Sequence, residues 1–188
     1  MIKYIGSKRV LVPTIEGVVR SIPEVRSVVD FFSGTSRVGM ALKKAGYRVH
    51  ANDFMSYAHV LGQAYVATDR EDVEAECREI IAHLDALPGE AGYFTETFCV
   101  RSRFFQPRNG ARVDAIREEI DRLGVSDEVR AVLLVSLMEA ADRVDSTTGV
   151  QMAYLKQWAR RSHNDLALRM PELLPAVKDG PCLSLIHI

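Results

Sequence analysis

Two acids and a small-residue turn within residues 27–53 have the types and spacing of a nucleotide-cofactor site. Asp30 follows a β-branched run that predicts a buried strand, and Gly34 lies in the turn after it, where a glycine lets the backbone approach a ligand closely. Asp53 follows a second predicted strand, residues 47–51, where a Rossmann-type fold places the carboxylate that accepts hydrogen bonds from ribose hydroxyls. We therefore expect this unit to bind a nucleoside-containing cofactor.

The charge of this turn indicates which cofactor fits. A dinucleotide site usually has a third glycine where this chain has Ser36, so that a pyrophosphate can bind the helix N-terminus. The carboxylate of Asp30 would repel a pyrophosphate but pair with an ammonium group, which favours S-adenosylmethionine over NAD. The alternative is an ordinary turn before a helix at residues 37–45, with Asp30 and Ser33 as helix caps and Gly46 as the stop.

The N-terminus adds a second motif. Lys3–Lys8 reads KYIGSK and is followed by an apolar helical stretch that reaches Ile22. Together with Asp30, Phe32 and Gly34, which stand in a DxFxG pattern, this segment resembles the cofactor motifs of the Dam-like adenine-N6 DNA methyltransferases. Segments 93–94, 103–116 and 141–150 are similar to the inserted region of one Dam-related branch, so the resemblance extends to about residue 175 in the order of the family.

The resemblance implies an α/β protein with an incomplete Rossmann-like class I methyltransferase fold and a helical insertion. It implies S-adenosylmethionine as cofactor, double-stranded DNA with a flipped adenine as substrate, and a cognate restriction endonuclease system as partner. By the same resemblance Asp53 would hold the ribose hydroxyls, Asp30 and Lys8 would frame the methionine end, and three aromatics would line the adenine or the sulfonium. The implied cofactor-binding residues are Tyr4, Gly6, Lys8, Asp30, Phe32, Ser33, Gly34, Ser36, Asp53 and Phe54.

The catalytic motif of the family is absent from the sequence. These enzymes carry a D/N-P-P-Y/F tetrapeptide that holds the target amino group and stacks on the flipped base, yet the chain contains no Pro-Pro pair. In the order of the family this motif would follow within a few tens of residues of Leu174. We therefore assign no catalytic residue and expect the chain to be inactive alone.

The last residues suggest a reason. Residues 183–188, LSLIHI, match the conceptual translation of a transposase adapter used in sequencing libraries. Our hypothesis is that the reading frame ran from a DNA fragment into the adapter, so these residues are an artefact, as an engineered scar would be. The alternative is a short apolar C-terminal strand.

The chain beyond Asp53 is expected to be helical and to lose the strand–helix alternation. Apolar spacing, Ser126 as a cap and Gly124 as a stop predict helices at residues 54–67, 69–87, 112–123 and 126–141. We divide the chain into a cofactor-binding half at residues 1–70, a helical insertion and candidate target-recognition region at 71–165, the start of a return to the catalytic half at 166–182, and the artefact at 183–188.

Basic residues within the insertion alternate with aromatic ones, a combination that suits phosphate contacts together with stacking or wedging of bases. The alternative is that the aromatics form a core and the basic residues a solvated rim. The aromatics are Phe98, Phe104, Phe105 and Trp158, and the candidate DNA-binding residues are Arg101, Arg103, Lys156, Arg160 and Arg161.

Composition limits the remaining functions. The net charge of −1 provides no global attraction to DNA, so any contact must come from local patches. Cys77, Cys99 and Cys182 show neither a CxxC spacing nor histidine partners, and no apolar run has signal-peptide or transmembrane character, so we expect no metal site and a cytoplasmic protein. An RNA adenine methyltransferase and a Rossmann-type nucleotide-binding module without transferase activity stay open as alternatives.

Overall fold

The computed structural model describes residues 2, 6–148 and 153–186. They form two compact units, and each is described by itself. The α/β unit comprises residues 6–75, 127–132 and 172–188, and the helical unit comprises residues 1–5, 76–126 and 133–171.

A small parallel sheet forms the centre of the α/β unit, with the strand order β1-β2-β3. The first two strands were predicted. The expectation that β1 is buried was wrong, since none of its residues is fully buried, and β2 extends further than expected and includes Asp53 itself. In the register Val28 lies beside Val49, and His50 lies beside Leu183. The strands are β1 (Ser27–Asp30), β2 (Arg48–Asp53) and β3 (Leu183–Ile186).

Helices connect these strands much as the apolar spacing predicted. The helix after the cofactor turn ends at Lys44, and Gly46 follows with φ +94°, as expected for its C-terminal stop. The predicted helix after Asp53 begins later, at Ser56, and its last part is π-helical. The helical segments are η1 (Lys8–Val10), α1 (Val12–Ser21), α2 (Arg37–Lys44), α3 (Ser56–Gly62) and the π-helix η2 (Gln63–Ala67).

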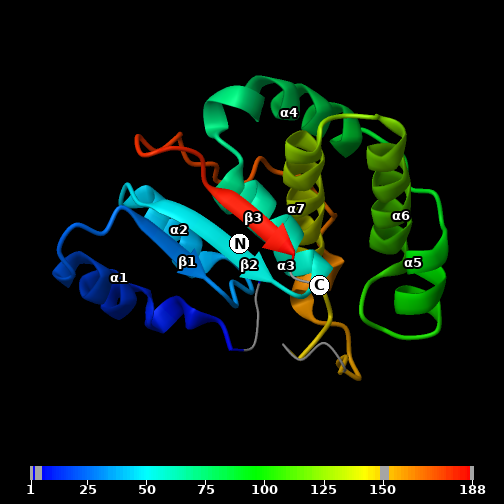
Figure 1. Cartoon of the computed structure of the whole chain (residues 1–188). Helices are drawn as coiled ribbons and strands as arrows, with labels where there is room; N and C mark the ends of the chain where they lie inside the picture. The colour runs from blue at the N-terminus through cyan, green and yellow to red at the C-terminus, as the bar shows by residue number, and fades with distance from the viewer. Residues whose placement is uncertain (1, 3–5, 149–152, 187–188) are drawn as a thin grey trace. The chain divides into compact units, whose positions relative to one another are not determined.

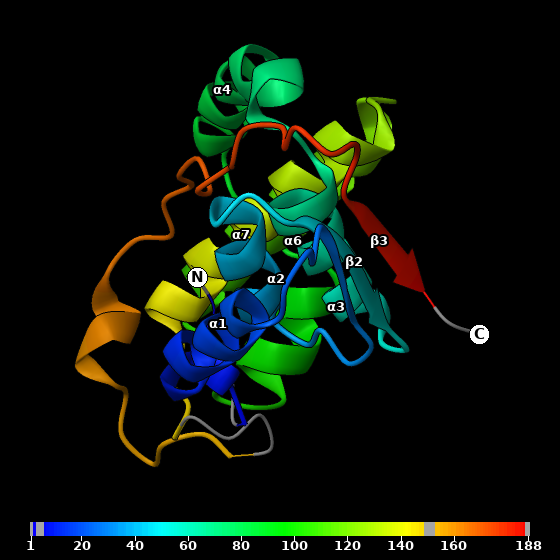
Figure 2. The ribbon, with the colours of Figure 1, turned by 60° about the vertical axis from the view of Figure 1, so that its left-hand side comes forward.

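One face of the sheet packs against α2 and α3, which lie behind the strands in Figure 1 and to the left of β2 and β3 in Figure 2. Val49 and Ala51 point toward these helices and are fully buried. Gly39 permits the close approach of α2, because a Cβ at this position would lie 2.9 Å from a methyl group of Val66. The alternation of buried residues along β2 therefore shows that helices cover one face of the sheet, whereas the other face is open to solvent.

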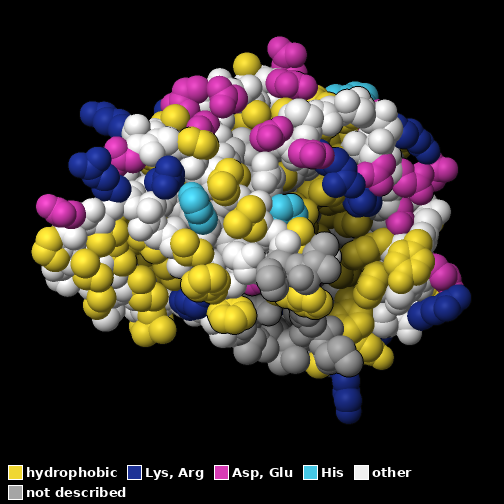
Figure 3. Space-filling view, viewed as in Figure 1, with side chains coloured by type: hydrophobic (Ala, Val, Ile, Leu, Met, Phe, Trp, Pro, Cys, Tyr) yellow, Lys and Arg dark blue, Asp and Glu magenta, His cyan; other side chains and the backbone are white. Residues whose placement is uncertain are grey.

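The open face carries apolar side chains. Val29 is 48% exposed, and Leu183 and Leu185 are 41% and 46% exposed. Figure 3 views the molecule from this side and shows apolar side chains there and over η1 and α1, where Val10, Leu11 and Val18 are exposed.

The last strand, β3, consists of residues that we interpreted as adapter-derived. Leu183–Ile186 pair in parallel with His50–Asp53 of β2, which agrees with the alternative of a short apolar C-terminal strand. The ability to form a strand does not test the origin of these residues, so the artefact stays a hypothesis.

The helical unit is built from a succession of helices whose apolar faces form its core. Ile116 and Leu133 are fully buried there, and none of the helices in the described ranges is both long and apolar enough to cross a membrane. Its elements are α4 (Arg70–Asp85), α5 (Tyr93–Thr95), the π-helix η3 (Glu96–Val100), α6 (Pro107–Arg122), α7 (Asp127–Val144) and η4 (Arg160–His163); α4 and α7 begin in the α/β unit.

Helix α6 begins earlier than the sequence pattern predicted, at Pro107 instead of Arg112. Proline suits the first position of a helix, where its missing N–H is not needed. Within α6, burial alone would raise the pKa of Asp114, but hydrogen bonds from Thr95, Phe94 and Gly92 outweigh this effect and lower the pKa below its usual value. Asp114 therefore caps α5 as a carboxylate.

A buried lysine connects α2 to the end of η2. The Nζ of Lys43 donates to the carbonyls of Val66 (2.9 Å) and Thr68 (2.8 Å) and to Asp69 Oδ1 (2.7 Å), while its side chain is fully buried. All three of its N–H groups thus have acceptors.

Replacing Lys43 with Met should lower the free energy of unfolding by about 2–3 kcal/mol, because a partly buried carboxylate and two carbonyls lose their donor. The neighbouring Lys44, whose exposed side chain lies 3.5 Å from Glu172, provides the control. Lys44→Met should cost less than about 1 kcal/mol. Equal losses for the two variants in urea unfolding would contradict the role assigned to Lys43.

Candidate cofactor site and nucleic-acid interface

The turn between β1 and α2 is held by the last two residues of β2. The backbone N–H of Ser33 donates to the Asn52 carbonyl (3.0 Å), and that of Gly34 donates to Asp53 Oδ2 (2.8 Å). The side-chain amide of Asn52 donates in turn to the Phe31 carbonyl (3.1 Å). These bonds fix the turn at the carboxyl end of the sheet, the edge where open α/β folds bind ligands.

The backbone of this turn is in an uncommon conformation at two positions. Gly34 has φ +52° and Ser36 has φ +57°, both in the left-handed region. The conformation is easy for glycine but costs energy for serine, and such residues cluster at binding sites. Ser36 is fully buried and precedes α2, yet its hydroxyl makes no capping hydrogen bond.

The N-terminal motif reaches the same turn. Lys8 Nζ lies 3.5 Å from Asp30 Oδ1 and donates to the Phe32 carbonyl at 2.6 Å. The structure thus brings together Lys8, Asp30, Phe32, Gly34 and Asp53, which the sequence places in three separate motifs. Gly6 lies in a turn just before this lysine with φ +82°, and Tyr4 lies outside the described residues.

Buried polar atoms without partners also gather in these motifs. Asp30 Oδ2, Ser7 Oγ and Ser36 Oγ are buried and have no hydrogen-bond partner, and they are the only such side-chain oxygens among the described residues. The Asp30 side chain is 11% exposed, so water does not readily replace the missing partner. Since buried polar groups in proteins are nearly always hydrogen-bonded, these atoms are candidate contacts for a ligand. Sequence reasoning did not include Ser7, because its signal exists only in three dimensions.

Asp53 has a structural role, which is separate from the ribose contact expected from the sequence. Its Oδ2 accepts from the Gly34 N–H, and its Oδ1 accepts from the Met55 N–H at 3.0 Å. Each carboxylate oxygen can accept a further hydrogen bond, so the side chain keeps capacity for ligand hydroxyls.

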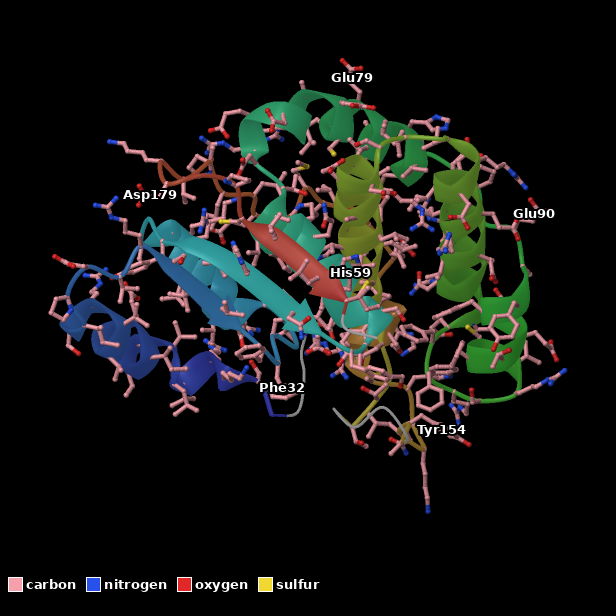
Figure 4. The ribbon with its side chains drawn as sticks, viewed as in Figure 1. Phe32, His59, Glu79, Glu90, Tyr154 and Asp179 are labelled. Atoms are coloured by element: carbon pink, nitrogen blue, oxygen red, sulfur yellow. The ribbon has the colours of Figure 1, made fainter. Side chains whose placement is uncertain are left out.

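Three phenylalanines at the carboxyl ends of β1 and β2 are exposed. Phe32 is 80% exposed, Phe54 is 73% exposed and Phe31 is 67% exposed. Figure 4 shows Phe32 at this end of the sheet. Phe32 and Phe54 were predicted from the sequence as site residues, whereas Phe31 was not. Large exposed apolar side chains that lie together are typical of binding surfaces.

The predicted DNA-binding residues of the helical unit have different environments. Arg103 lies over the ring of Trp158, with 4.7 Å between its Cζ and the ring centroid, and Lys156 and Arg160 are exposed. Arg101 pairs with Glu96 at 3.0 Å. Arg161 is held internally, because its Nε donates to Asp145 Oδ1 (2.5 Å) and its Nη2 donates to the Thr147 carbonyl (2.9 Å).

The aromatics of the same region contact one another, which is the arrangement of the alternative in which they form a core. Phe98 and Phe104 have ring centroids 6.3 Å apart, and Phe94 lies 5.1 Å from Phe105. Tyr154 extends this cluster outward, with its ring 5.3 Å from Phe104 and its side chain partly exposed (Figure 4). These phenylalanines are nonetheless only half-buried, so they pack together as a cluster and also reach the surface.

No group of His, Cys, Asp and Glu in the described ranges could hold a metal ion. Burial raises the pKa of Cys77 to about 12 and that of Cys99 to about 11. Both thiols are therefore protonated and unreactive at neutral pH.

Comparison with known proteins identifies the family of this chain. The chain belongs to the D12 class N6 adenine-specific DNA methyltransferase family, whose pattern it matches over residues 4–178. It is 29% identical to the type II methyltransferase M.NlaIII of Neisseria lactamica, over 94% of this chain and 56% of that protein. It is 28% identical to the modification methylase StsI of Streptococcus sanguinis, over 89% of this chain and 28% of that protein.

A third relative is the type II methyltransferase M.CviAII of Paramecium bursaria Chlorella virus 1, with 30% identity over 85% of this chain and 51% of that protein. The chain thus spans 56% or less of the length of these relatives. No solved structure matches it significantly.

The partnerless oxygen of Asp30 leads to a prediction about the ligand-free protein. Asp30→Asn should leave the melting temperature unchanged or raise it by a few degrees, because it removes a buried charge that is only partly compensated by Lys8. Asp69→Asn is the matched control and should lower the melting temperature, since Asp69 loses its bond to Lys43. A comparable decrease in both variants would show that Asp30 is a stabilising residue.

Proposed function

We propose that this chain is the cofactor-binding and target-recognition part of an adenine-N6 DNA methyltransferase that uses S-adenosylmethionine. The observation that carries the proposal is the buried, partnerless oxygen of Asp30 beside Lys8 in a strained turn. Family membership and the printed names of the relatives, which are methyltransferases and modification methylases, support the same conclusion.

The residues of the turn fit the methionine end of this cofactor. A free amino acid group carries an ammonium and a carboxylate, and the site offers one carboxylate, Asp30, and one ammonium, Lys8, as partners. The buried hydroxyl of Ser36 supplies a neutral hydrogen-bonding group. Hydrogen bonds to β2 hold the backbone of Ser33 and Gly34 close to the edge of the sheet, which leaves room for a ligand. Gly6 lies in the turn that leads into Lys8.

The nucleoside end is assigned to Asp53 and the aromatics. Asp53 accepts the ribose hydroxyls with the acceptor capacity left after it binds the turn. Phe32, Phe54 and Tyr4 line the adenine and the sulfonium, where exposed apolar rings exclude water from the reacting group. When bound, the cofactor supplies an electrophilic methyl group, and the protein's own residues only position it.

The substrate assigned to the whole protein is double-stranded DNA. An exocyclic amine conjugated to a purine is a poor nucleophile, so the adenine must be flipped out and its amine held toward the methyl group. The groups that would do this belong to the D/N-P-P-Y/F motif, which these residues lack. The helical insertion at 71–165 is assigned to target recognition, and a restriction endonuclease system in the cytoplasm is the setting we propose. Residues 1–70 and 166–182 then form parts of one Rossmann-like methyltransferase domain.

Calorimetric titration tests the proposal directly. The chain should bind S-adenosylmethionine without transferring its methyl group to adenine in duplex DNA, because the hydrogen bonds that polarise the amine act in the transition state. Asp53→Ala should weaken this binding by about ten- to a hundredfold, the value of charge-assisted hydrogen bonds, and lower the melting temperature because two backbone N–H groups lose their acceptor. Asp179→Ala, an exposed carboxylate of the same unit, should change neither.

Each failure has a different meaning. Unchanged affinity of Asp53→Ala with a lowered melting temperature would restrict Asp53 to its structural role. No binding of the cofactor to the unaltered chain would reject the proposed function and favour a nucleotide-binding module without transferase activity. Selective binding of RNA instead of duplex DNA would favour an RNA adenine methyltransferase.

A further inference from the structure

We propose that Arg103, stacked on Trp158, reads a guanine base in the DNA target, while Lys156 and Arg160 contact phosphates. This inference rests on the proposed function and names the residue that would determine sequence specificity. It concerns the helical unit alone.

The guanidinium of Arg103 is held in place by two independent contacts. Its Cζ lies over the indole ring of Trp158, and its Nη1 donates to the Lys156 carbonyl at 2.7 Å. A guanidinium carries five N–H donors in a rigid fork, and one carbonyl uses only one of them. No further partner of Arg103 occurs among the described residues, so the remaining donors are available to a ligand in a fixed direction.

The backbone on both sides of this pair is fixed by one buried residue. The N–H of Ser146 donates to the carbonyl of Phe104, next to Arg103, at 2.7 Å. Its hydroxyl accepts from the N–H of Ala159, next to Trp158, at 3.0 Å. Ser146 is fully buried, so these hydrogen bonds are shielded from water. The stack between residues far apart in the sequence is therefore preorganised.

An isolated antiparallel β-bridge lies close to the pair of Arg103 and Trp158. Thr147 pairs with Tyr154, and the N–H of Leu155 donates to the Ser146 carbonyl at 3.0 Å. Tyr154 contacts Phe104, and its exposed ring lies in the lower right part of Figure 4. An exposed aromatic next to a fixed arginine is typical of surfaces that meet nucleic-acid bases.

The other basic residues of the region differ from Arg103 in ways that separate their roles. Arg161 is committed to Asp145, and Arg101 pairs with Glu96, so much of their charge is compensated internally. Lys156 and Arg160 are exposed and carry long, flexible chains, which suits phosphates whose positions vary little with sequence.

Guanine is the base that matches the fixed fork. It presents two acceptors, O6 and N7, on its major-groove edge, and a bidentate arginine is the commonest specific contact to it. A guanidinium that is restricted to one plane and direction gains most from such a bidentate partner, because little side-chain freedom is lost on binding.

Selection of bound duplexes from a randomised library tests the inference, with the chain itself as bait. The unaltered chain should enrich a motif with at least one guanine position. Arg103→Lys keeps the charge but loses the fork, and it should reduce the preference for that guanine by about 5- to 150-fold while the other positions persist. Trp158→Leu should weaken the preference for guanine at the same position of the motif, because the Arg103 side chain loses the ring that holds it in place.

Lys156→Gln and Arg160→Gln are the matched controls. Each should weaken binding to all sequences by a similar factor, keep the motif, and reduce the slope of log affinity against log salt concentration by about one. All four variants should bind S-adenosylmethionine as the unaltered chain does, which verifies that they are folded.

The outcomes separate this inference from the proposed function. A motif that survives Arg103→Lys unchanged would overturn the reading role of Arg103 and leave the methyltransferase assignment intact. The same holds if the chain binds duplexes without any sequence preference. A chain that binds no duplex DNA would contradict the proposed function and, with it, this inference.

Discussion

The hydrogen bond between the Gly34 N–H and the Asp53 carboxylate is the interaction on which the proposed cofactor site depends. It fixes the turn after β1 to the end of β2, and the neighbouring bonds of Asn52 to Ser33 and Phe31 extend this connection. Because hydrogen bonds hold the turn at successive residues, Ser36 can keep a left-handed backbone conformation that would otherwise be unfavourable. Lys8 and Asp30 then meet at the same edge of the sheet.

This arrangement stores energy in the ligand-free protein. A buried carboxylate oxygen without a donor, and buried hydroxyls of Ser7 and Ser36 without partners, each reduce the stability of the fold. A ligand that supplies the missing partners recovers this energy on binding. Lys43 illustrates the opposite case, since its buried ammonium is fully satisfied by the protein and therefore only stabilises it. The contrast separates groups reserved for a ligand from groups that support the fold.

Local sequence patterns predicted the first two strands and most helix positions, because apolar spacing and the stop at Gly46 are local signals. The early start of α6 at Pro107 was missed, since the basic and aromatic residues before Arg112 obscured the helix. The convergence of Lys8 with Asp30 was predicted from the family resemblance, not from spacing. Tyr4 lies outside the described residues and stays a prediction.

Interactions between distant residues were beyond sequence reasoning. The absence of a partner for Asp30 Oδ2 is a property of the folded surroundings, and no residue type indicates it. Composition placed arginines and aromatics in one region but did not distinguish Arg103, which stacks on Trp158, from Arg161, which is bound to Asp145. The structure thus shows that the residues of the predicted nucleic-acid interface have different environments.

The central claim is that Asp30 is reserved for the ammonium group of the ligand. The most direct test compares the affinities of the unaltered chain and Asp30→Asn for S-adenosylhomocysteine, which has the amino acid end, and for methylthioadenosine, which lacks it. The account predicts that the substitution weakens S-adenosylhomocysteine binding at least tenfold, about 1.4 kcal/mol, and changes methylthioadenosine binding less than about twofold. An equal loss for both ligands would contradict it.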